Sequence, residues 1–204
     1  MSLDAFPRPS RFAPEEWAAR VQLAAAYRIF HRLGWTELIY NHISLRVPGE
    51  PGCYLINPFG LHYSEVTASN LVKVDEKDAI VGPSDWPVNP AGITFHGAIH
   101  RLRPEVHCVM HVHTTPTMAV CCLDGGLSFT NFYAAQLFGK VAYHDFEGIT
   151  VHADEGARIL QSAGDNFCGR CTAPAGKDHQ GYLGIGRIVQ CSVRLIPVLN
   201  FPFC

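Results

Sequence analysis

Hydrophobic positions near the start of the chain follow the period of an α-helix. From Pro14 onward, apolar side chains recur at three- and four-residue steps, the spacing of one helical face. Pro14 is favoured in a first helical turn, and Gly34 suits the residue after a helix end. The pattern predicts a helix that begins at Pro14 and ends at Gly34. Its expected buried face consists of Trp17, Val21, Ala24, Ala25, Ile29 and Leu33.

Short apolar runs and helical patterns alternate along the rest of the chain. ISLRV and CYLINP are predicted as strands on either side of the turn cluster PGEPG. A helix is predicted over residues 90–103, where an Asn-Pro pair supplies a cap and a first-turn proline. It is expected to bury Phe95, Ile99 and Leu102. Later segments are expected as helices in FYAAQLFG and DEGARILQSAG, and as extended chain in VAYHDF and GITVH.

This alternation of strands and helices, without repeats or low complexity, predicts one α/β domain. The chain has 204 residues, which suits a single domain. We expect residues 1–13, with their prolines, to form a loose N-terminal arm, and residues 14–204 to form the domain.

Composition narrows the classes of function. The chain is 48% hydrophobic and 17% charged, with a formal charge of -2 and no basic block, so nucleic acid is not an expected partner. No apolar segment of signal-peptide type or of membrane-span length is present in the sequence. The expected compartment is therefore the cytoplasm, and no membrane association is expected.

Eight cysteines raise the question of disulfide bonds. We favour free thiols, because free cysteine is a common buried residue and no secretory signal accompanies these cysteines. Cys168 and Cys171 have C-x-x-C spacing, but no second such pair follows at zinc-ribbon distance. A structural role is therefore expected for this pair.

Two histidines end an apolar run in the segment CVMHVHTTP. Val109, Met110 and Val112 suit a strand, whose side chains alternate between faces, so His111 and His113 are expected on one face. Neutral imidazole is a good ligand for Zn²⁺, but a catalytic zinc site has three protein ligands. From spacing alone, a metal site and quiet packing remain equally open.

A second pair, His96 and His100, has i, i+4 spacing on the helix predicted over residues 90–103. The metalloprotease pattern requires a glutamate directly after the first histidine, and Gly97 stands there instead. We expect both side chains to pack or to support other ligands. Spacing alone assigns no role to His42.

Several segments, taken in order, carry a resemblance to a known family. They are LAAAYRIFHRLGWTELIYNHISLRVPG, YLINPFGLHYSEVTASNLVKVD, VNPAGITFHGAIHRLRPEVHCVMHVHTTP and NFYAAQLFGKVAYHDFEG. Together they resemble the class II aldolase/adducin domain family from about Pro14 to Gly164. The resemblance implies a three-layer α/β/α fold around a mainly antiparallel sheet. It also implies homotetramers with active sites near subunit boundaries.

The resemblance further implies a divalent cation, most often Zn²⁺, held by three histidines. His111 and His113 match two of them. The third family histidine lies in an Asn-His-Gly motif, for which the nearest match is DHQG at residues 178–181, so His179 is the candidate. This match has Asp for Asn and an inserted Gln180, and residues 167–204 diverge from the family. His144 and His152 would be poorer substitutes.

One position of the family's catalytic pattern is different here. In the family's sugar-phosphate aldolases, a Ser-Ser-Glu segment supplies phosphate contacts and a proton-transfer glutamate near the metal. Alignment on Phe95-His96 places that glutamate at Gly92 and the two serines at Pro90 and Ala91. Glycine cannot transfer a proton, so this chain resembles the adducin-like branch, and a phosphorylated sugar is not expected as substrate.

Other side chains are therefore needed for proton transfer. His96 and Tyr133 are the candidates for catalysis, with His42 or a metal-bound hydroxide as further possible bases. His42, Asn57 and Gly60 match the family's substrate-contacting loops, so the resemblance implies that they bind the substrate.

Three functions follow as expectations. The first is a metal-dependent lyase, an aldolase or decarboxylase, acting on a small non-phosphorylated hydroxy- or oxo-acid. Its metal would be Zn²⁺, with Fe²⁺ or Mn²⁺ as alternatives. The second is a non-catalytic, adducin-like interaction module. The third is a non-haem iron oxygenase or decarboxylase.

Overall fold

The computed structural model describes residues 7–145, 147–148, 152 and 154–164, together with the backbone of residues 168–172 and 189–191. His179 lies outside these residues, so its predicted role is not addressed by the structure. The helices are α1 (Pro14–Arg32), α2 (Pro90–Gly92), the π-helix η2 (Ile93–Gly97), α3 (Ala98–Leu102), α4 (Thr115–Cys121), α5 (Phe132–Ala135) and α6 (Glu155–Ala163). The strands are β1 (His42–Arg46), β2 (Tyr54–Ile56), β3 (Val72–Val74), β4 (Cys108–Val112), β5 (Val141–Asp145), β6 (Cys168–Thr172) and β7 (Val189–Cys191).

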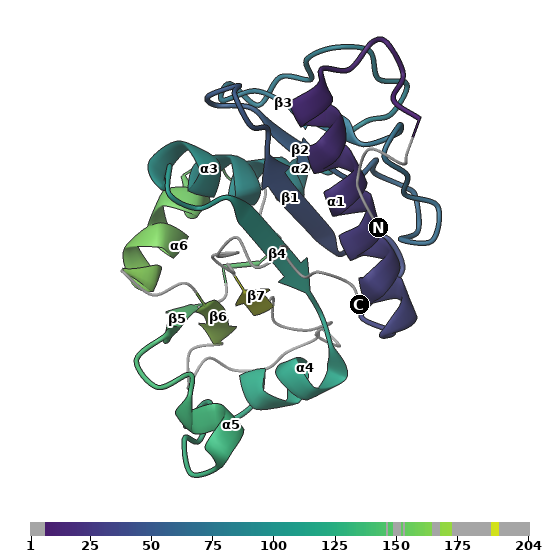
Figure 1. Ribbon diagram of the computed structural model, residues 1–204. Helices are drawn as coiled ribbons and strands as arrows, with labels where there is room; N and C mark the ends of the chain where they lie inside the picture. Colours follow the sequence, from purple (N-terminus) through teal and green to yellow (C-terminus); the bar gives the residue numbers. More distant parts are fainter. Residues whose placement is uncertain are drawn as a thin grey trace.

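The strands form one sheet in the order β3-β2-β1-β4-β7-β6-β5 (Figure 1). All neighbouring pairs are antiparallel except β5 and β6, which are parallel. The prediction of an α/β fold with a mainly antiparallel sheet is confirmed. In β1 and β4, residues 42 and 111 are direct partners across the ladder.

Alternation along the strands gives the sheet two buried faces. On one face, Ile43, Leu55 and Cys108 pack in a cluster with Leu23 and Tyr27 of α1. On the other face, Ile56 of β2 packs with Ile93, while Val109 of β4 packs with Phe95, Ile99 and Ile159. Helix α1 therefore covers one face, and the segment α2-η2-α3 with α6 covers the other.

The buried face of α1 differs from the predicted one. Val21 is buried as expected, but Ile29 is 56% exposed and Leu33 is 52% exposed. The face that meets the sheet carries Ala19, Leu23, Tyr27 and Phe30 instead. The predicted buried face was wrong because the true buried face also carries a charged pair. A prediction from hydrophobic positions alone assigns charged residues to the solvent side.

That charged pair is Glu16 and Arg20, one helical turn apart. Arg20 Nε lies 2.8 Å from the Glu16 carboxylate, and an Arg20 NH group donates to the Leu71 carbonyl at 2.6 Å. Lys73 of β3 approaches the same carboxylate at 3.0 Å. The pair is buried because each charge has both an ionic and a hydrogen-bonding partner.

The helix predicted over residues 90–103 is present, but it is not uniformly α-helical. The Asn89 side chain caps it by accepting from the backbone N–H of residue 91. Phe95 and Ile99 are buried as predicted, whereas Leu102 is 57% exposed. The η2 turn takes up an extra residue, so the 3.6-residue period no longer places Leu102 on the buried face.

Helix α6 approaches α3 closely at one glycine. A Cβ atom on Gly156 would lie 2.4 Å from the Cβ of Ala98 and 2.9 Å from the Thr94 carbonyl oxygen. Only glycine allows this approach, which holds α6 against the helical layer.

Other sequence expectations concern cysteines and membranes. Cys53, Cys108, Cys121 and Cys122 are free thiols, as predicted. Within the described residues, no helix has the length and apolar character needed to cross a membrane. In the segment predicted as an N-terminal arm, Phe12 is buried and stacks on Trp17.

Candidate functional site

Histidines converge on the sheet face opposite α1. His42 of β1 and His111 of β4 are direct ladder partners, and their rings stack with centroids 4.5 Å apart. We call His42, His96, His100, His111 and His113 the imidazole cluster. Side chains alternate between the two faces along a strand. Ile43 points to α1, so its neighbours His42 and Ser44 point to the opposite face.

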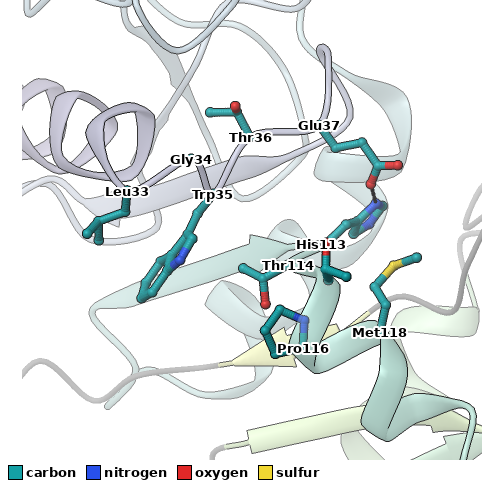
Figure 2. Close-up of a pocket in the computed structure, with 10 residues that line it drawn as sticks. Leu33, Gly34, Trp35, Thr36, Glu37, His113, Thr114, Pro116 and Met118 are labelled. Atoms are coloured by element: carbon teal, nitrogen blue, oxygen red, sulfur yellow. Dashed lines mark hydrogen bonds and ion pairs between the residues drawn. The ribbon is translucent and has the colours of Figure 1, made fainter.

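His111 and His113 meet through their Nε2 atoms, which lie 2.7 Å apart. His111 is buried in the strand, and His113 follows directly after its end. On the far side of the His113 ring, Nδ1 lies 2.7 Å from a carboxylate oxygen of Glu37 (Figure 2). A carboxylate that accepts from Nδ1–H leaves the Nε2 lone pair for another partner.

Glu37 was not identified from the sequence. It lies in the loop between Gly34 and β1, 76 residues before His113, so no spacing pattern connects them. The sequence offers one signal for it: Glu37 is the one acidic residue between the predicted helix and the first predicted strand.

These atoms fit part of a metal centre. Two imidazole nitrogens converge, and a carboxylate fixes one ring in the manner of a carboxylate–histidine–metal arrangement. His111 Nδ1 is buried without a hydrogen-bond partner within the described part of the chain, so only Nε2 of that ring is engaged. A third protein ligand is required, and the candidate His179 lies outside the described residues.

Behind this pair, a hydrogen-bonded chain runs through the interior. His42 Nδ1 lies 2.7 Å from His96 Nε2, and His96 Nδ1 lies 2.6 Å from Ser44 Oγ. Ser44 Oγ lies 2.8 Å from His100 Nε2. His96 and His100 lie one helical turn apart, and His42 and Ser44 lie two residues apart on one face of β1. The two helical histidines can therefore contact both β1 residues. The predicted role of the two helical histidines, packing or support of other ligands, stays a prediction.

Burial keeps these imidazoles neutral. Desolvation, followed by repulsion from neighbouring imidazoles, lowers the pKa of His42, His96 and His111 well below the usual value. Desolvation, with Arg46 as the next cause, lowers the pKa of His100 to about 3. Neutral imidazole is the form that accepts a hydrogen bond or binds a cation.

Gly92 stands at the position where the sequence resemblance places a glutamate. It lies against His42, the first member of the hydrogen-bonded chain of side chains. A Cβ atom there would be 3.3 Å from Ile56 Cδ1 and 3.5 Å from the His42 ring. His42 therefore occupies the space next to residue 92, and a longer side chain would have to displace it.

A cavity of about 440 Å³ opens beside His113 and Glu37 (Figure 2). Leu33, Trp35, Pro116 and Met118 contribute apolar surface, and threonines contribute hydroxyl groups; the lining is Leu33, Gly34, Trp35, Thr36, Glu37, His113, Thr114, Thr115, Pro116 and Met118. Among the residues that the structure describes, this lining contains one carboxylate and no lysine or arginine.

The remaining predicted site residues lie elsewhere. Asn57 is buried, and its side-chain oxygen accepts from Tyr27 at 2.9 Å. Gly60 lies in the loop after β2 with a positive φ of 96°. Tyr133 is 80% exposed on α5, and its ring contacts Phe132. Within the described residues, Tyr133 makes no hydrogen bond or ring contact with the imidazole cluster.

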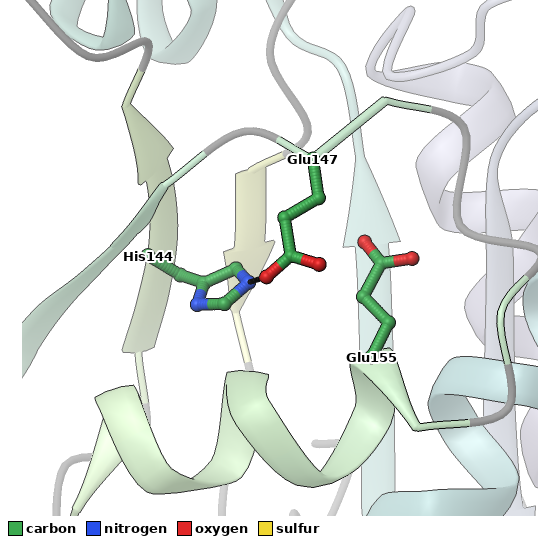
Figure 3. Close-up of side chains that lie close together, drawn as sticks. All are labelled: His144, Glu147 and Glu155. Atoms are coloured by element: carbon green, nitrogen blue, oxygen red, sulfur yellow. Dashed lines mark ion pairs between the residues drawn. The ribbon is translucent and has the colours of Figure 1, made fainter.

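A second group of possible ligands lies at the β5 edge of the sheet (Figure 3). His144 on β5, Glu147 after it and Glu155 at the start of α6 have potential ligand atoms within 4.8 Å of one another. We call these three residues the carboxylate cluster. His144 Nε2 lies 3.4 Å from a Glu147 oxygen, and its Nδ1 lies 2.8 Å from Ser162 Oγ.

The positively charged side chain of Arg158 already contacts the carboxylate cluster. Arg158 Nε lies 2.9 Å and 3.1 Å from the two Glu147 oxygens, and its other nitrogens reach Glu147 and Asp154. Hydrogen bonds from Arg158 are the main cause that lowers the pKa of Glu147. Glu155 also stands in the first turn of α6, where the helix dipole favours an acid and disfavours a metal cation.

Comparison with known proteins places the chain in a family. The sequence profile of the Class II Aldolase and Adducin N-terminal domain matches residues 21–173. Alpha-adducin of Rattus norvegicus is 47% identical over 147 residues, which cover 71% of this chain and 20% of that protein. A Caulobacter vibrioides protein named for aldolase class 2 is 42% identical over 149 residues, covering 73% of this chain and 58% of that protein. The chain thus spans less than two thirds of these relatives' lengths.

Solved structures show the same fold. An aldolase II superfamily protein from Pseudomonas syringae superposes with a TM-score of 0.78 at 36% identity, covering 94% of this chain and 75% of that chain. An L-fuculose 1-phosphate aldolase from Glaciozyma antarctica PI12 has a TM-score of 0.71 at 24% identity, covering 94% and 71% respectively. The second likeness concerns the fold alone. From the matching profile and these relatives, we conclude that the chain belongs to the class II aldolase and adducin family.

Proposed function

We propose that this chain is a metal-dependent lyase, an aldolase or decarboxylase, that acts on a small non-phosphorylated hydroxy- or oxo-acid. One observation carries the proposal: His111 Nε2 and His113 Nε2 converge to 2.7 Å beside an open cavity. The proposed cofactor is a divalent cation, Zn²⁺ first, with Fe²⁺ or Mn²⁺ as alternatives.

In this proposal, His111 and His113 hold the cation, and His179 is the third ligand. Glu37 fixes the ring of His113 through Nδ1, so that Nε2 faces the cation. When bound, a divalent cation supplies Lewis acidity to a carbonyl or enediolate oxygen of the substrate.

The lining of the cavity supports a substrate without a phosphate group. Phosphate is usually bound by arginine, lysine or a set of backbone N–H groups, and no arginine or lysine is among the described residues that line this cavity. At the positions that the resemblance aligns with serines, Pro90 and Ala91 offer no side-chain donors. The apolar surface of Trp35 and Met118 suits the carbon skeleton of the substrate.

Proton transfer is proposed to involve His42 and His96. Both nitrogens of His96 are engaged, one by His42 and one by Ser44, so His96 acts through His42. His42 takes the substrate contact, with Asn57 and Gly60 in the neighbouring loop as further substrate-binding candidates. Tyr133 remains a predicted catalytic residue, and it would have to be supplied from the exposed surface of α5.

The chain is also proposed to act as a homo-oligomer, a tetramer, in the cytoplasm. Large apolar side chains are exposed on α1, directly after it and on α5: Ile29 at 56%, Leu33 at 52%, Phe132 at 75% and Tyr133 at 80%. Apolar surface of this kind favours contact with another protein surface. Light scattering of the purified chain tests the tetramer.

A second candidate function is a non-catalytic interaction module. The 47% identity with rat alpha-adducin over 147 residues and the glycine at position 92 favour it. Such a module has no requirement for a bound cation, whereas the lyase requires one.

Elemental analysis and an activity screen separate these functions. The purified protein and its His111→Ala variant would be analysed for metal, then assayed on a panel of hydroxy- and oxo-acids. We expect stoichiometric metal and turnover in the wild type, and loss of both in the variant. A folded wild type without metal or turnover would contradict the lyase and support the module. Oxygen consumption that depends on Fe²⁺ would support the iron oxygenase instead.

A further inference from the structure

The cavity beside His113 has an apolar part as well as a polar end (Figure 2). His113 and Glu37 form the polar end, where they are joined by their hydrogen bond. The apolar part includes Trp35, from the segment after α1, and Pro116 and Met118, from α4. The proposed binding of a cation uses only the polar end, so the apolar part requires an explanation of its own.

The Trp35 ring is held in place although it is 41% exposed. It meets the buried ring of Phe30 edge-on, with centroids 5.2 Å apart. Its backbone N–H donates to the Phe30 carbonyl at 2.9 Å, and its own carbonyl accepts from the Asn41 side chain at 3.3 Å. A large aromatic side chain that is already fixed loses little conformational entropy when a ligand binds. The exposed surface of Trp35 is therefore well prepared to contact one.

The cavity is larger than a short acid requires. Its volume is about 440 Å³, and each water of the liquid occupies about 30 Å³, so the cavity has room for about 15 waters. A three-carbon hydroxy-acid would displace only a few of them and would leave most of the apolar surface in contact with water. Cavities of about 300–1,000 Å³ enclose ligands of drug size, which commonly carry a ring. The volume therefore favours a substrate with a bulky group.

The apolar side chains favour an aromatic ring over an aliphatic chain. The indole of Trp35 can pack against another ring in an offset or edge-on geometry, which adds to the gain from burial alone. The thioether sulfur of Met118 also makes favourable contacts with the edge of an aromatic ring. Trp35 and Met118 line the same cavity from separate segments, so one ring in that cavity can contact both.

The charges around the cavity disfavour an anionic group on that ring. Glu37 is the one carboxylate in the described lining, and this part of the structure contributes no lysine or arginine to it. A carboxylate or phosphate on the ring would leave water near Glu37 without a cation to pair with, which is costly. The ring is therefore expected to be uncharged.

We propose that Trp35 and Met118 determine specificity by binding an uncharged aromatic ring, so that the substrate is an aryl-substituted hydroxy- or oxo-acid with a single carboxylate. The acid part rests on the proposed function, because the reacting end of the molecule is placed at His111 and His113. The ring site rests on the cavity alone. In this arrangement the ring contacts Trp35, and the reacting carbons lie beside His113.

Calorimetric titration of the full chain, in the presence of Zn²⁺, measures this preference without requiring turnover. We expect phenyllactate to bind about 10- to 100-fold more tightly than lactate, the gain from burying a phenyl-sized apolar group. Cyclohexyllactate, which has a ring without π electrons, should bind about three- to tenfold less tightly than phenyllactate. Phenyllactate with a second carboxylate on the ring should bind less tightly by about tenfold or more.

Variants on two elements assign the preference to the cavity. Trp35→Ala should lower the ratio of phenyllactate to lactate affinity by about tenfold, and Met118→Ala by about threefold. Trp35→Phe keeps an aromatic ring and should keep most of the preference. Trp86→Ala is the matched control, because Trp86 is 38% exposed and lies outside the described lining of the cavity. Circular dichroism shows which variants are folded, and Met118→Ala tests the site if Trp35→Ala is not.

The outcomes separate the ring site from the proposed function. If phenyllactate binds no more tightly than lactate, or if neither acid binds, the ring site is overturned. A preference that persists unchanged in the folded Trp35→Ala and Met118→Ala variants overturns it as well. If the preference is found and lost in these variants but no acid is turned over, the ring site stands and the lyase fails. Turnover of short acids in preference to aryl acids would support the lyase and overturn the ring site.

Discussion

The imidazole cluster and the carboxylate cluster are both groups of potential metal ligands, yet their charges are balanced differently. In the imidazole cluster, burial lowers the pKa of His42, His96 and His111, and two Nε2 atoms converge beside a cavity. In the carboxylate cluster, Arg158 already contacts both oxygens of Glu147. A group of ligand atoms is therefore a credible metal site when its lone pairs face open space, and not when a guanidinium already neutralises them.

The two clusters also differ in how they are held. His111 and His113 come from β4 and its immediate continuation, with His42 on the paired strand. The carboxylate cluster joins the end of β5, the following loop and the first turn of α6. Ligands on paired strands keep their relative positions better than ligands on a loop, which favours the imidazole cluster as a binding site.

The largest expected difference between the clusters is in Zn²⁺ affinity. Loss of His113 by His113→Ala should weaken Zn²⁺ binding by more than about hundredfold, because a direct ligand is removed. Glu147→Gln should change it by less than about twofold. Competition with a chromophoric chelator measures both. A large loss in Glu147→Gln with none in His113→Ala would mean that the carboxylate cluster holds the cation.

The next effect concerns the carboxylate that orients His113. Glu37→Gln keeps the size of the side chain but loses the charge that holds Nδ1–H. We expect Zn²⁺ binding weaker by about 10- to 100-fold, the usual loss for a residue that orients a ligand. Glu65→Gln, a change of an exposed glutamate outside the imidazole cluster, serves as control. Unchanged affinity in Glu37→Gln would show that the His113 ring is held by other contacts.

The dependence of folding stability on acidic pH should be larger for the buried histidines than for the exposed acids. His100 has its pKa lowered from 6.5 to about 3, so folding favours its neutral form. Its stabilising contribution is complete above pH 6.5 and is lost as the pH falls between these values, because only the unfolded chain then binds the proton. Over that range, His100→Gln should reduce the slope of unfolding free energy against pH by about 1.4 kcal/mol per pH unit. Parallel slopes for the two proteins in urea titrations would contradict this assignment.

The smallest expected effect is in the carboxylate cluster. Arg158 lowers the pKa of Glu147 below the usual 4.5, so this ion pair is intact at neutral pH and is lost only as the pH falls below that value. Because both partners are exposed and screened by solvent, Glu147→Gln should leave the thermal midpoint at pH 7 within the error of the measurement. A clear drop would show that the pair stabilises the attachment of α6.

Local sequence patterns predicted the main elements of the fold. The α1 segment, the strand that contains His111 and the capped helix after Asn89 are all present, because each depends on contacts between residues near in sequence. The buried face of α1 was wrong at Ile29 and Leu33, since the ion pair of Glu16 and Arg20 depends on distant partners in β3. The predicted burial of Leu102 was wrong for a local reason, the π-helical turn η2.

The sequence by itself determined that His111 and His113 share a face, because strand alternation is a local property of the backbone. It also indicated a supporting role for His96 and His100 from their helical spacing. Only the tertiary structure decided that Glu37 orients His113 and that Ser44 connects the two helical histidines. These partners are separated by 52 to 76 residues along the chain, and only the packing of the helical layer and the loop before β1 against the sheet brings them within hydrogen-bonding distance.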